Sequence, residues 1–233
     1  MTSSPPMPQA GHEAPRRAVE RLARGITDGT YGVGFTLRPS LLADELGLAE
    51  AVLGEAVRVL AGKSLVDAAH RVRPQADWNV LDTDVLRWTL TPGAPWPDGF
   101  SPDLHELRRA VEPSAAALAA QFRSSADLIA LDEALTAMAA AERSPQGDPA
   151  LAVLADVAFH TALLTASGNR FFAQLPRVLV PALAARGERV RMGPHRPPLS
   201  SHTEVAARVR EMDADGAYTA MLELLDVSLR DDP

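Results

Sequence analysis

The sequence Asp156-Val-Ala-Phe-His160, followed by Thr161-Ala-Leu-Leu-Thr-Ala-Ser-Gly-Asn169, decides how the second part of this chain folds. Apolar residues recur through it at helical spacing until Ser167-Gly168-Asn169, so we expect one helix that ends there. Asp156 and His160 are four residues apart and share one face of that helix. A titratable pair is costly on an apolar helix unless it has a task, such as binding a cation or an anionic ligand. The alternative is an Asp–His hydrogen bond that only positions a core histidine.

The composition favours a mainly α-helical protein. The 233 residues are enough for one large domain or two modest ones. Alanine and leucine are abundant, whereas aromatic residues and runs of β-branched residues are scarce. The lack of cysteine excludes disulfides and thiolate metal sites. The sequence has no long apolar run and no signal-peptide pattern, so we expect a cytoplasmic protein that does not associate with membranes.

The net charge of −7 is unevenly distributed along the chain. Residues 1–78 carry nine Lys/Arg and nine Asp/Glu, whereas residues 79–233 carry fourteen and twenty-one. The acidic second part argues against nucleic-acid binding there. The neutral first part leaves the question open, because binding depends on the placement of charges as well as on their total.

The first part of the chain has the pattern of a winged helix-turn-helix. We expect the Pro/Ser/Gly-rich residues 1–13 to be disordered. Ser64-Leu-Val-Asp67 predicts a strand that leads to a basic tip at residues 69–73. Apolar periodicity predicts helices at residues 15–28, 39–47 and 49–61. Three short helices and a strand pair with a basic tip are typical of a winged helix-turn-helix, which we place at residues 14–76.

The rest of the chain is predicted to be a connector and a helical bundle. Residues 77–102 form the connector, with a short helical part at 78–88 and a Pro/Gly-rich part at 91–102. The bundle covers residues 103–231. Its predicted helices span residues 103–122, 125–142, 149–167, 170–190, 200–212 and 214–230.

Motifs in both parts carry a family resemblance. In the first part they are Gly34-x-x-Leu37, Leu42-Ala43-x-x-Leu46-Gly47, Glu55-Ala56 and Gly62-x-x-Leu65-Val66. In the second part they are Glu106-Leu-Arg108-x-x-x-Glu112-Pro113, Asp156-x-x-x-His160, Ser167-Gly168-Asn169 and His202. With these motifs the chain resembles, over about residues 15–230, the GntR superfamily of bacterial regulators, in the FadR-like branch with an FCD ligand-binding domain. The segment Trp78–Trp88 further resembles family members that sense sugar acids such as galactonate.

The resemblance implies a cavity in the bundle where an Asp and up to three His hold a divalent metal, which captures a carboxylate effector. The candidate metal ligands are then Asp156, His160 and His202. Zinc, nickel or manganese would accept such oxygen and imidazole ligands. Leu224 stands where the family has its third histidine, which leaves three ligands. An effector held by hydrogen bonds alone is the alternative to a metal.

Arg108, Glu112 and Asn169 are the candidate effector-binding residues. Arg108 lies one helical turn before Glu112, and the resemblance implies that it offers a bidentate fork to a carboxylate. The alternative is a simple i,i+4 salt bridge between Arg108 and Glu112.

The predicted recognition helix departs from the family pattern. The family signature Ser-Arg-Thr-Pro-Val-Arg-Glu-Ala-Leu is here Ala49-Glu-Ala-Val-Leu-Gly-Glu-Ala-Val57, so Glu50 and Gly54 replace both arginines that would meet DNA. Each Arg–guanine pair contributes roughly 1–3 kcal/mol of discrimination, so the two losses remove roughly 2–6 kcal/mol. The remaining candidates suffice for phosphate contacts. They are Arg38, Arg58, Lys63, His70, Arg71 and Arg73.

The sequence therefore favours an effector-responsive transcriptional regulator that binds operator DNA as a homodimer. The alternative is a sensor with the same fold and pocket that has lost specific operator binding, as Glu50 and Gly54 suggest. An enzyme with a metal-activated water is less favoured. The sequence shows no nucleophile–base pair, no glycine-rich phosphate loop and no paired carboxylates to support that class.

Overall fold

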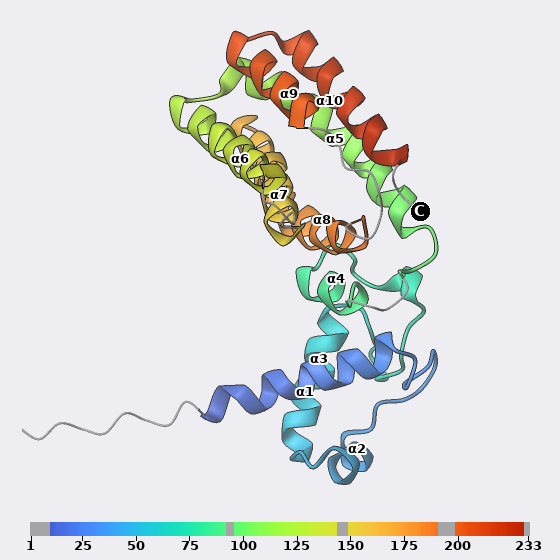
Figure 1. Ribbon diagram of the computed structural model, residues 1–233. Coiled ribbons are helices and arrows are strands. Elements are labelled where there is room, and N and C mark those ends of the chain that lie inside the picture. The colour runs from blue at the N-terminus through green and yellow to red at the C-terminus, as the bar shows by residue number, and fades with distance from the viewer. Residues whose placement is uncertain (1–9, 92–95, 144–148, 191–198, 231–233) are drawn as a thin grey trace, which may run out of the picture. The chain divides into compact units, whose positions relative to one another are not determined.

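The computed structural model of the chain describes residues 10–91, 96–143, 149–190 and 199–230 (Figure 1). Within these ranges the chain is helical apart from turns, loops and isolated β-bridges, which confirms the mainly α fold class. The chain divides into two compact units, Met1–Thr89 and Leu90–Pro233. None of the helices in the described ranges is long and apolar enough to cross a membrane.

The first unit is built on the helices α1 (Ala10–Thr27), α2 (Pro39–Leu46) and α3 (Glu50–Gly62). α3 packs against both α1 and α2, and their buried leucines form the core of the unit. Pro39 suits the first position of α2 because its φ is fixed at a helical value. Gly47 ends α2 in the left-handed conformation, with φ 63°. The bounds of α2 and α3 agree with the predicted ranges to within one residue.

α1 begins earlier than the sequence suggested. It starts at Ala10, five residues before the predicted start at Pro15. Pro15 removes one hydrogen bond inside the helix, but the strong helix formers Ala10 and Ala14 extend α1 beyond it. The expected disorder therefore does not hold for residues 10–13, and residues 1–9 lie outside the described part of the chain.

The predicted strand at residues 64–67 is reduced to isolated antiparallel bridges, which pair Val66 with Val72 and Thr36 with Arg71. Asp67 closes the turn between them. Its Oδ1 accepts hydrogen bonds from the backbone N–H groups of Ala69 and Arg71, at 2.8 and 2.9 Å. With so tight a turn, the wing consists of isolated β-bridges and not of two strands joined by a continuous ladder of hydrogen bonds.

The predicted connector, residues 77–102, is divided between the two units. η1 (Gln75–Asp77) and α4 (Thr83–Thr89) belong to the first unit. There Val85 and Trp88 join the apolar core. α4 is therefore a packed helix of the first unit and not part of a free linker.

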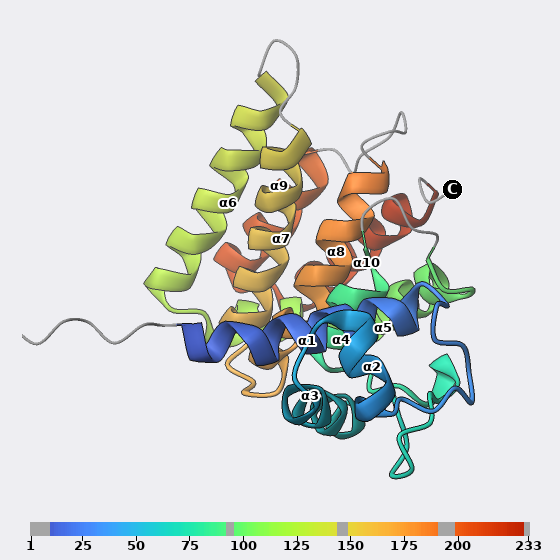
Figure 2. The same ribbon diagram turned by 90° about the horizontal axis from the view of Figure 1, so that it is seen from below.

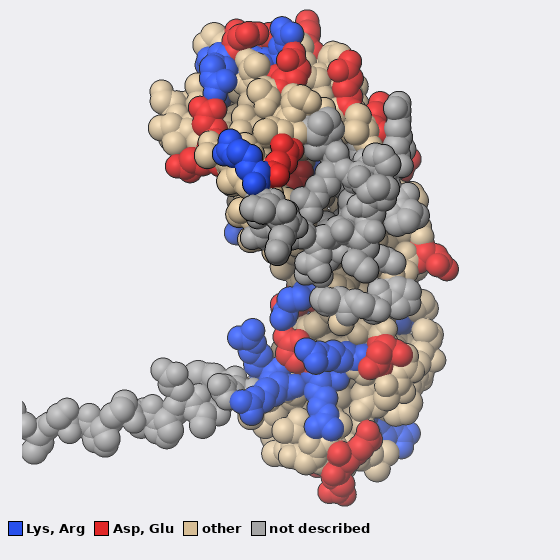
Figure 3. Space-filling view, viewed as in Figure 1, with Lys and Arg blue, Asp and Glu red and all other residues tan. Residues whose placement is uncertain are grey.

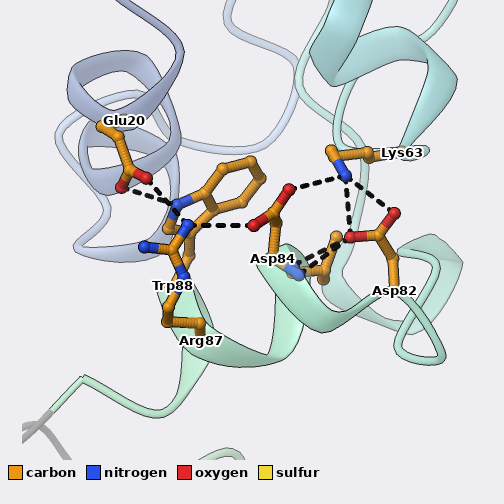
Figure 4. A network of polar contacts seen from close by, with 7 residues as sticks. Glu20, Lys63, Asp82, Asp84, Arg87 and Trp88 are labelled. Carbon is orange, nitrogen blue, oxygen red and sulfur yellow. Dashed lines mark hydrogen bonds and ion pairs between the residues drawn. The ribbon is translucent and has the colours of Figure 1, made fainter. Parts of the chain in front are cut away.

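Polar contacts also fix α4 to the first unit (Figure 4). Trp88 Nε1 donates a hydrogen bond to Glu20 of α1 at 2.9 Å. Lys63, directly after α3, forms ion pairs with Asp82 at 2.8 Å and Asp84 at 2.9 Å. These contacts hold both flanks of α4 against the three-helix core.

The second unit is a helical bundle in which α5 packs along α10 and α6 along α7 (Figures 1 and 2). Fully buried alanines of α5 let its neighbours approach closely, and Phe159, Met221 and Leu224 lie in the same core. The described elements are α5 (Phe100–Phe122), α6 (Ser125–Arg143), α7 (Pro149–Ala166), η2 (Phe172–Gln174), α8 (Pro176–Val190), α9 (Leu199–Glu211) and α10 (Ala214–Arg230).

One predicted helix of the bundle is split. The range 170–190 contains the short 3-10 helix η2 and then α8, which starts at Pro176. Proline lacks the N–H that a continuous helix needs at this position, but it suits the first turn of a new helix. The other predicted helices agree with the structure to within three residues at either end.

Candidate metal and effector site

The three predicted metal ligands come together in the second unit. Asp156 and His160 lie on α7 and His202 lies on α9. One ligand atom from each side chain lies within 4.8 Å of the other two. Asp156 Oδ1 is 3.1 Å from His202 Nε2 and 3.6 Å from His160 Nε2. We call these three residues the Asp–His cluster.

The two histidines of the cluster are buried, whereas the side chain of Asp156 is 31% exposed. Phe159, which is fully buried, contacts both imidazoles edge to face, with ring centroids 5.0 Å from His202 and 5.7 Å from His160. The apolar ring packs against both imidazoles, and Asp156 is the member of the cluster that is partly exposed to solvent. The Asp–His cluster thus combines two buried imidazoles with one partly exposed carboxylate.

Glu112 of α5 orients His160 from the other side. Glu112 Oε2 is 2.7 Å from His160 Nδ1, and Glu112 is fully buried. When Nδ1–H donates to this carboxylate, Nε2 of the neutral imidazole carries the lone pair, and this atom lies 3.0 Å from Arg108 Nη2 and 3.6 Å from Asp156 Oδ1. Metal-binding histidines in proteins are held in this way, with the second ring nitrogen donating to a carboxylate.

Arg108 forms the salt bridge that was the alternative to effector binding. Its Nε is 2.7 Å from Glu112 Oε1, and its Nη2 is 3.0 Å from His160 Nε2. Arg108 is only 3% exposed, so its guanidinium neutralises Glu112 inside the bundle. A direct contact of Arg108 or Glu112 with an effector stays a prediction.

The charges of this site stabilise one another. Burial alone would raise the pKa of Glu112, but Arg108 and His160 lower it to about 2. Burial alone would lower the pKa of His160, but the carboxylate of Glu112, opposed by Arg108 and helped by Asp156, raises it to about 9. His160 and His202 hold the pKa of Asp156 well below its usual range, against the partial desolvation of a carboxylate that is 31% exposed. Without a metal, Glu112, Asp156 and His160 are therefore ionised at neutral pH.

Asn169 and Leu224 have structural roles. Asn169 Oδ1 accepts hydrogen bonds from the backbone N–H groups of Phe171 and Phe172, at 2.9 and 3.4 Å, and so stabilises the turn into η2. Its predicted contact with an effector stays a prediction. Leu224 is fully buried in the apolar core that also contains Phe159. The position of the third family histidine is therefore filled by hydrocarbon.

The side chains predicted to contact DNA differ in whether a carboxylate already pairs with them. Arg38 is exposed at the start of α2, and His70 lies at the tip of the wing with φ 62°. The other three arginines have ion-pair partners nearby in the sequence, which are Glu55 for Arg58, Asp67 for Arg71 and Asp77 for Arg73.

Lys63 has a structural role that was not predicted. Its side chain is only 19% exposed and binds Asp82 and Asp84, so it fixes α4 to the end of α3. The sequence did not show this because both partners lie about twenty residues further along the chain. Its contact with DNA stays a prediction.

Residues 103–227 match the FCD domain model. The chain is 30% identical over 226 residues to the galactonate operon transcriptional repressor of Escherichia coli K12, covering 92% of this chain and 94% of that protein. Among solved structures, Streptococcus agalactiae GntR is 26% identical with a TM-score of 0.51, covering 93% of this chain and 99% of that one. A structure of Lar from Listeria monocytogenes, 15% identical with a TM-score of 0.61, covers 93% of this chain and 95% of that chain and shares the fold.

These relatives are transcriptional regulators and not enzymes. The resemblance seen in the sequence motifs is thereby confirmed. The chain belongs to the GntR family of transcriptional regulators, in the branch whose second domain is an FCD domain.

Proposed function

We propose that the second unit binds a divalent metal ion through Asp156, His160 and His202, and that a small carboxylic acid completes the coordination of the ion. The observation that carries this proposal is the convergence of three ligand atoms within 4.8 Å, with His160 oriented by Glu112. One carboxylate oxygen and two imidazole nitrogens suit zinc, nickel or manganese. Such an ion would supply a positive anchor for the carboxylate of an effector.

The residues around the cluster support a site with open positions. Leu224 offers no ligand atom, so three protein ligands remain and the partly exposed Asp156 leaves an approach for the acid. Arg108 and Glu112 hold the ligand His160 in place. An acid held by hydrogen bonds alone is the alternative, and it requires no metal.

We propose that the acid is a sugar acid. The relative that is 30% identical along almost its whole length is named for the galactonate operon. Galactonate therefore is the first compound to test, with gluconate as an isomeric comparison and galactose as a control without a carboxylate.

We further propose that the first unit binds operator DNA as part of a homodimer and that the acid changes its DNA affinity. Linkage requires that DNA change the affinity for the acid by the same factor. A second function is a sensor with no specific operator, which the exposed Glu50 and the residue Gly54 on α3 favour. The two functions differ in whether the chain distinguishes one DNA sequence from another.

The test begins with calorimetric titration of chelator-treated protein with Zn²⁺, Ni²⁺ and Mn²⁺. His160→Ala and His202→Ala should each weaken binding by at least tenfold, whereas His70→Asn, a histidine change in the wing, should leave it unchanged. Metal affinities equal to the wild type in both cluster variants would show that these are core histidines only.

DNA binding is then measured by gel retardation on the upstream intergenic region and on a scrambled duplex, with and without galactonate. A regulator retards the upstream duplex more strongly, and galactonate changes that affinity. Equal retardation of both duplexes would favour the sensor without a specific operator.

A further inference from the structure

α1 carries four arginines on the face that does not pack against the core. Its buried residues Ala18, Leu22, Ala23 and Ile26 point into the first unit. Arg16 and Arg17 precede these residues, Arg21 and Arg24 lie between them, and all four arginines are exposed. Together with Arg87 of α4 they line a groove of about 830 Å³, which we call the α1 arginine groove. It is lined by Arg16, Arg17, Arg21, Arg24 and Arg87. Lys and Arg side chains gather over α1 in Figure 3.

The groove keeps an excess of positive charge. Its five arginines face three carboxylates, of Glu20, Asp28 and Glu45. Glu20 is held by Arg87 at 2.8 Å and by Trp88 at 2.9 Å. Asp28 accepts a hydrogen bond from the backbone N–H of Thr30 at 2.9 Å.

Two of the arginines are available to an anionic ligand. Within the side chains that the structure describes, neither Arg16 nor Arg24 contacts a carboxylate. Arg21 donates to the backbone carbonyl of Leu46 at 3.3 Å, a contact that leaves its charge uncompensated. The available charge thus extends along α1 and is not concentrated at one point.

The spacing of these charges indicates a polyanion. Arg16 and Arg24 are eight residues apart, which is about 12 Å along a helix with a rise of 1.5 Å per residue. One small anion cannot contact both ends of such a row. A DNA strand presents one phosphate for about every 3.4 Å of its axis, so a strand that runs along α1 offers a phosphate to each arginine.

The exposed face of α3 lacks such charges. Glu50 is exposed at its start, and Arg58 is paired with Glu55. We propose that the α1 arginine groove binds the phosphate backbone of DNA and supplies a sequence-independent share of the affinity. This inference rests on the proposed function of the first unit as a DNA-binding unit.

The test compares the salt dependence of DNA binding by the full chain and its variants. Fluorescence anisotropy is measured between 50 and 200 mM KCl on a 30-bp upstream duplex and on a scrambled duplex. Arg16→Ala/Arg24→Ala removes two phosphate contacts, so the slope of log affinity against log salt should become shallower by about 1.8 on both duplexes. The ratio of affinities at 50 and 200 mM salt should then fall about tenfold.

Matched variants separate the groove from a general charge effect. Arg143→Ala/Arg170→Ala removes two exposed arginines of the second unit and should keep the wild-type slope. Arg16→Lys/Arg24→Lys keeps the charges and should retain most of the slope. Thermal melts confirm that each variant is folded.

The outcomes distinguish this inference from the function on which it rests. The inference about the α1 arginine groove is overturned if Arg16→Ala/Arg24→Ala keeps the wild-type slope while Arg38→Ala/Arg71→Ala reduces it. That result leaves the proposed DNA-binding function intact. A wild-type chain that binds neither duplex at 50 mM salt overturns the proposed DNA-binding function together with the inference.

Discussion

The metal-free protein should lose stability as the pH rises from about 6.5 to about 9, and Glu112→Gln should remove most of this loss. The cause is the 2.7 Å contact between Glu112 and His160, which raises the pKa of His160 from 6.5 to about 9 against the effect of burial. A group whose pKa is raised on folding contributes its full stability below the unfolded pKa. That contribution is lost as the pH rises through the folded pKa.

The size of the effect follows from the pKa. At about 1.36 kcal/mol per pKa unit, a rise from 6.5 to about 9 corresponds to about 3 kcal/mol of stability. Glu112→Gln removes the carboxylate that holds the proton on His160. It also leaves the buried Arg108 without its charged partner, which should cost about 3–5 kcal/mol at pH 6.5. The variant is therefore less stable at pH 6.5 but less sensitive to the rise in pH.

The assay is urea denaturation in the presence of a chelator at pH 6.5 and pH 9.5, followed by circular dichroism. Glu106→Gln, an exposed change on the same helix α5, serves as the control and should keep the wild-type loss. NMR titration of the His160 imidazole measures its pKa directly. A Glu112→Gln variant that loses as much stability as the wild type between these pH values would refute this reasoning.

Three further changes have defined outcomes. Lys63→Met should lower the free energy of unfolding of the first unit by about 1 kcal/mol, because its ion pairs are partly exposed. It should leave DNA affinity unchanged. A loss of DNA affinity at equal stability would instead show that Lys63 contacts DNA. Gly54→Ala should raise the free energy of unfolding by about 0.5–1 kcal/mol, since no heavy atom lies within 4 Å of the added Cβ; chemical denaturation that shows a decrease would contradict the open space. Leu224→His should tighten Zn²⁺ binding in calorimetry, because it adds a fourth ligand, and an unchanged affinity would show that Leu224 does not take the place of the third family histidine.

The sequence predicted most helices because apolar periodicity and clear breaks coincide in them. α10 has the predicted bounds, and α6 ends one residue beyond its range. α4 was assigned to a connector because seven residues are too few for a periodic signal. The burial of Val85 and Trp88 depends on packing against α1, which lies more than fifty residues earlier in the chain. Apolar periodicity therefore does not predict short elements whose position is fixed by tertiary packing.

The site was predicted in part. The spacing of Asp156 and His160 indicated a shared helical face, whereas His202 came from the family resemblance, since no local pattern links residues 46 positions apart. The role of Glu112 as the partner of His160 was not predicted, because α5 and α7 meet only in the folded bundle. The arginines of α1 were also missed, although the pair Arg16-Arg17 followed by Arg21 and Arg24 on one amphipathic helix was a signal in the sequence.

The most direct test of the central claim is an anomalous-difference map from a crystal of the protein grown with zinc. The account predicts one strong peak in the second unit, at about 2.0–2.2 Å from Asp156 Oδ1, His160 Nε2 and His202 Nε2. A map with no peak between these three side chains, at zinc concentrations that saturate the protein in solution, would contradict it.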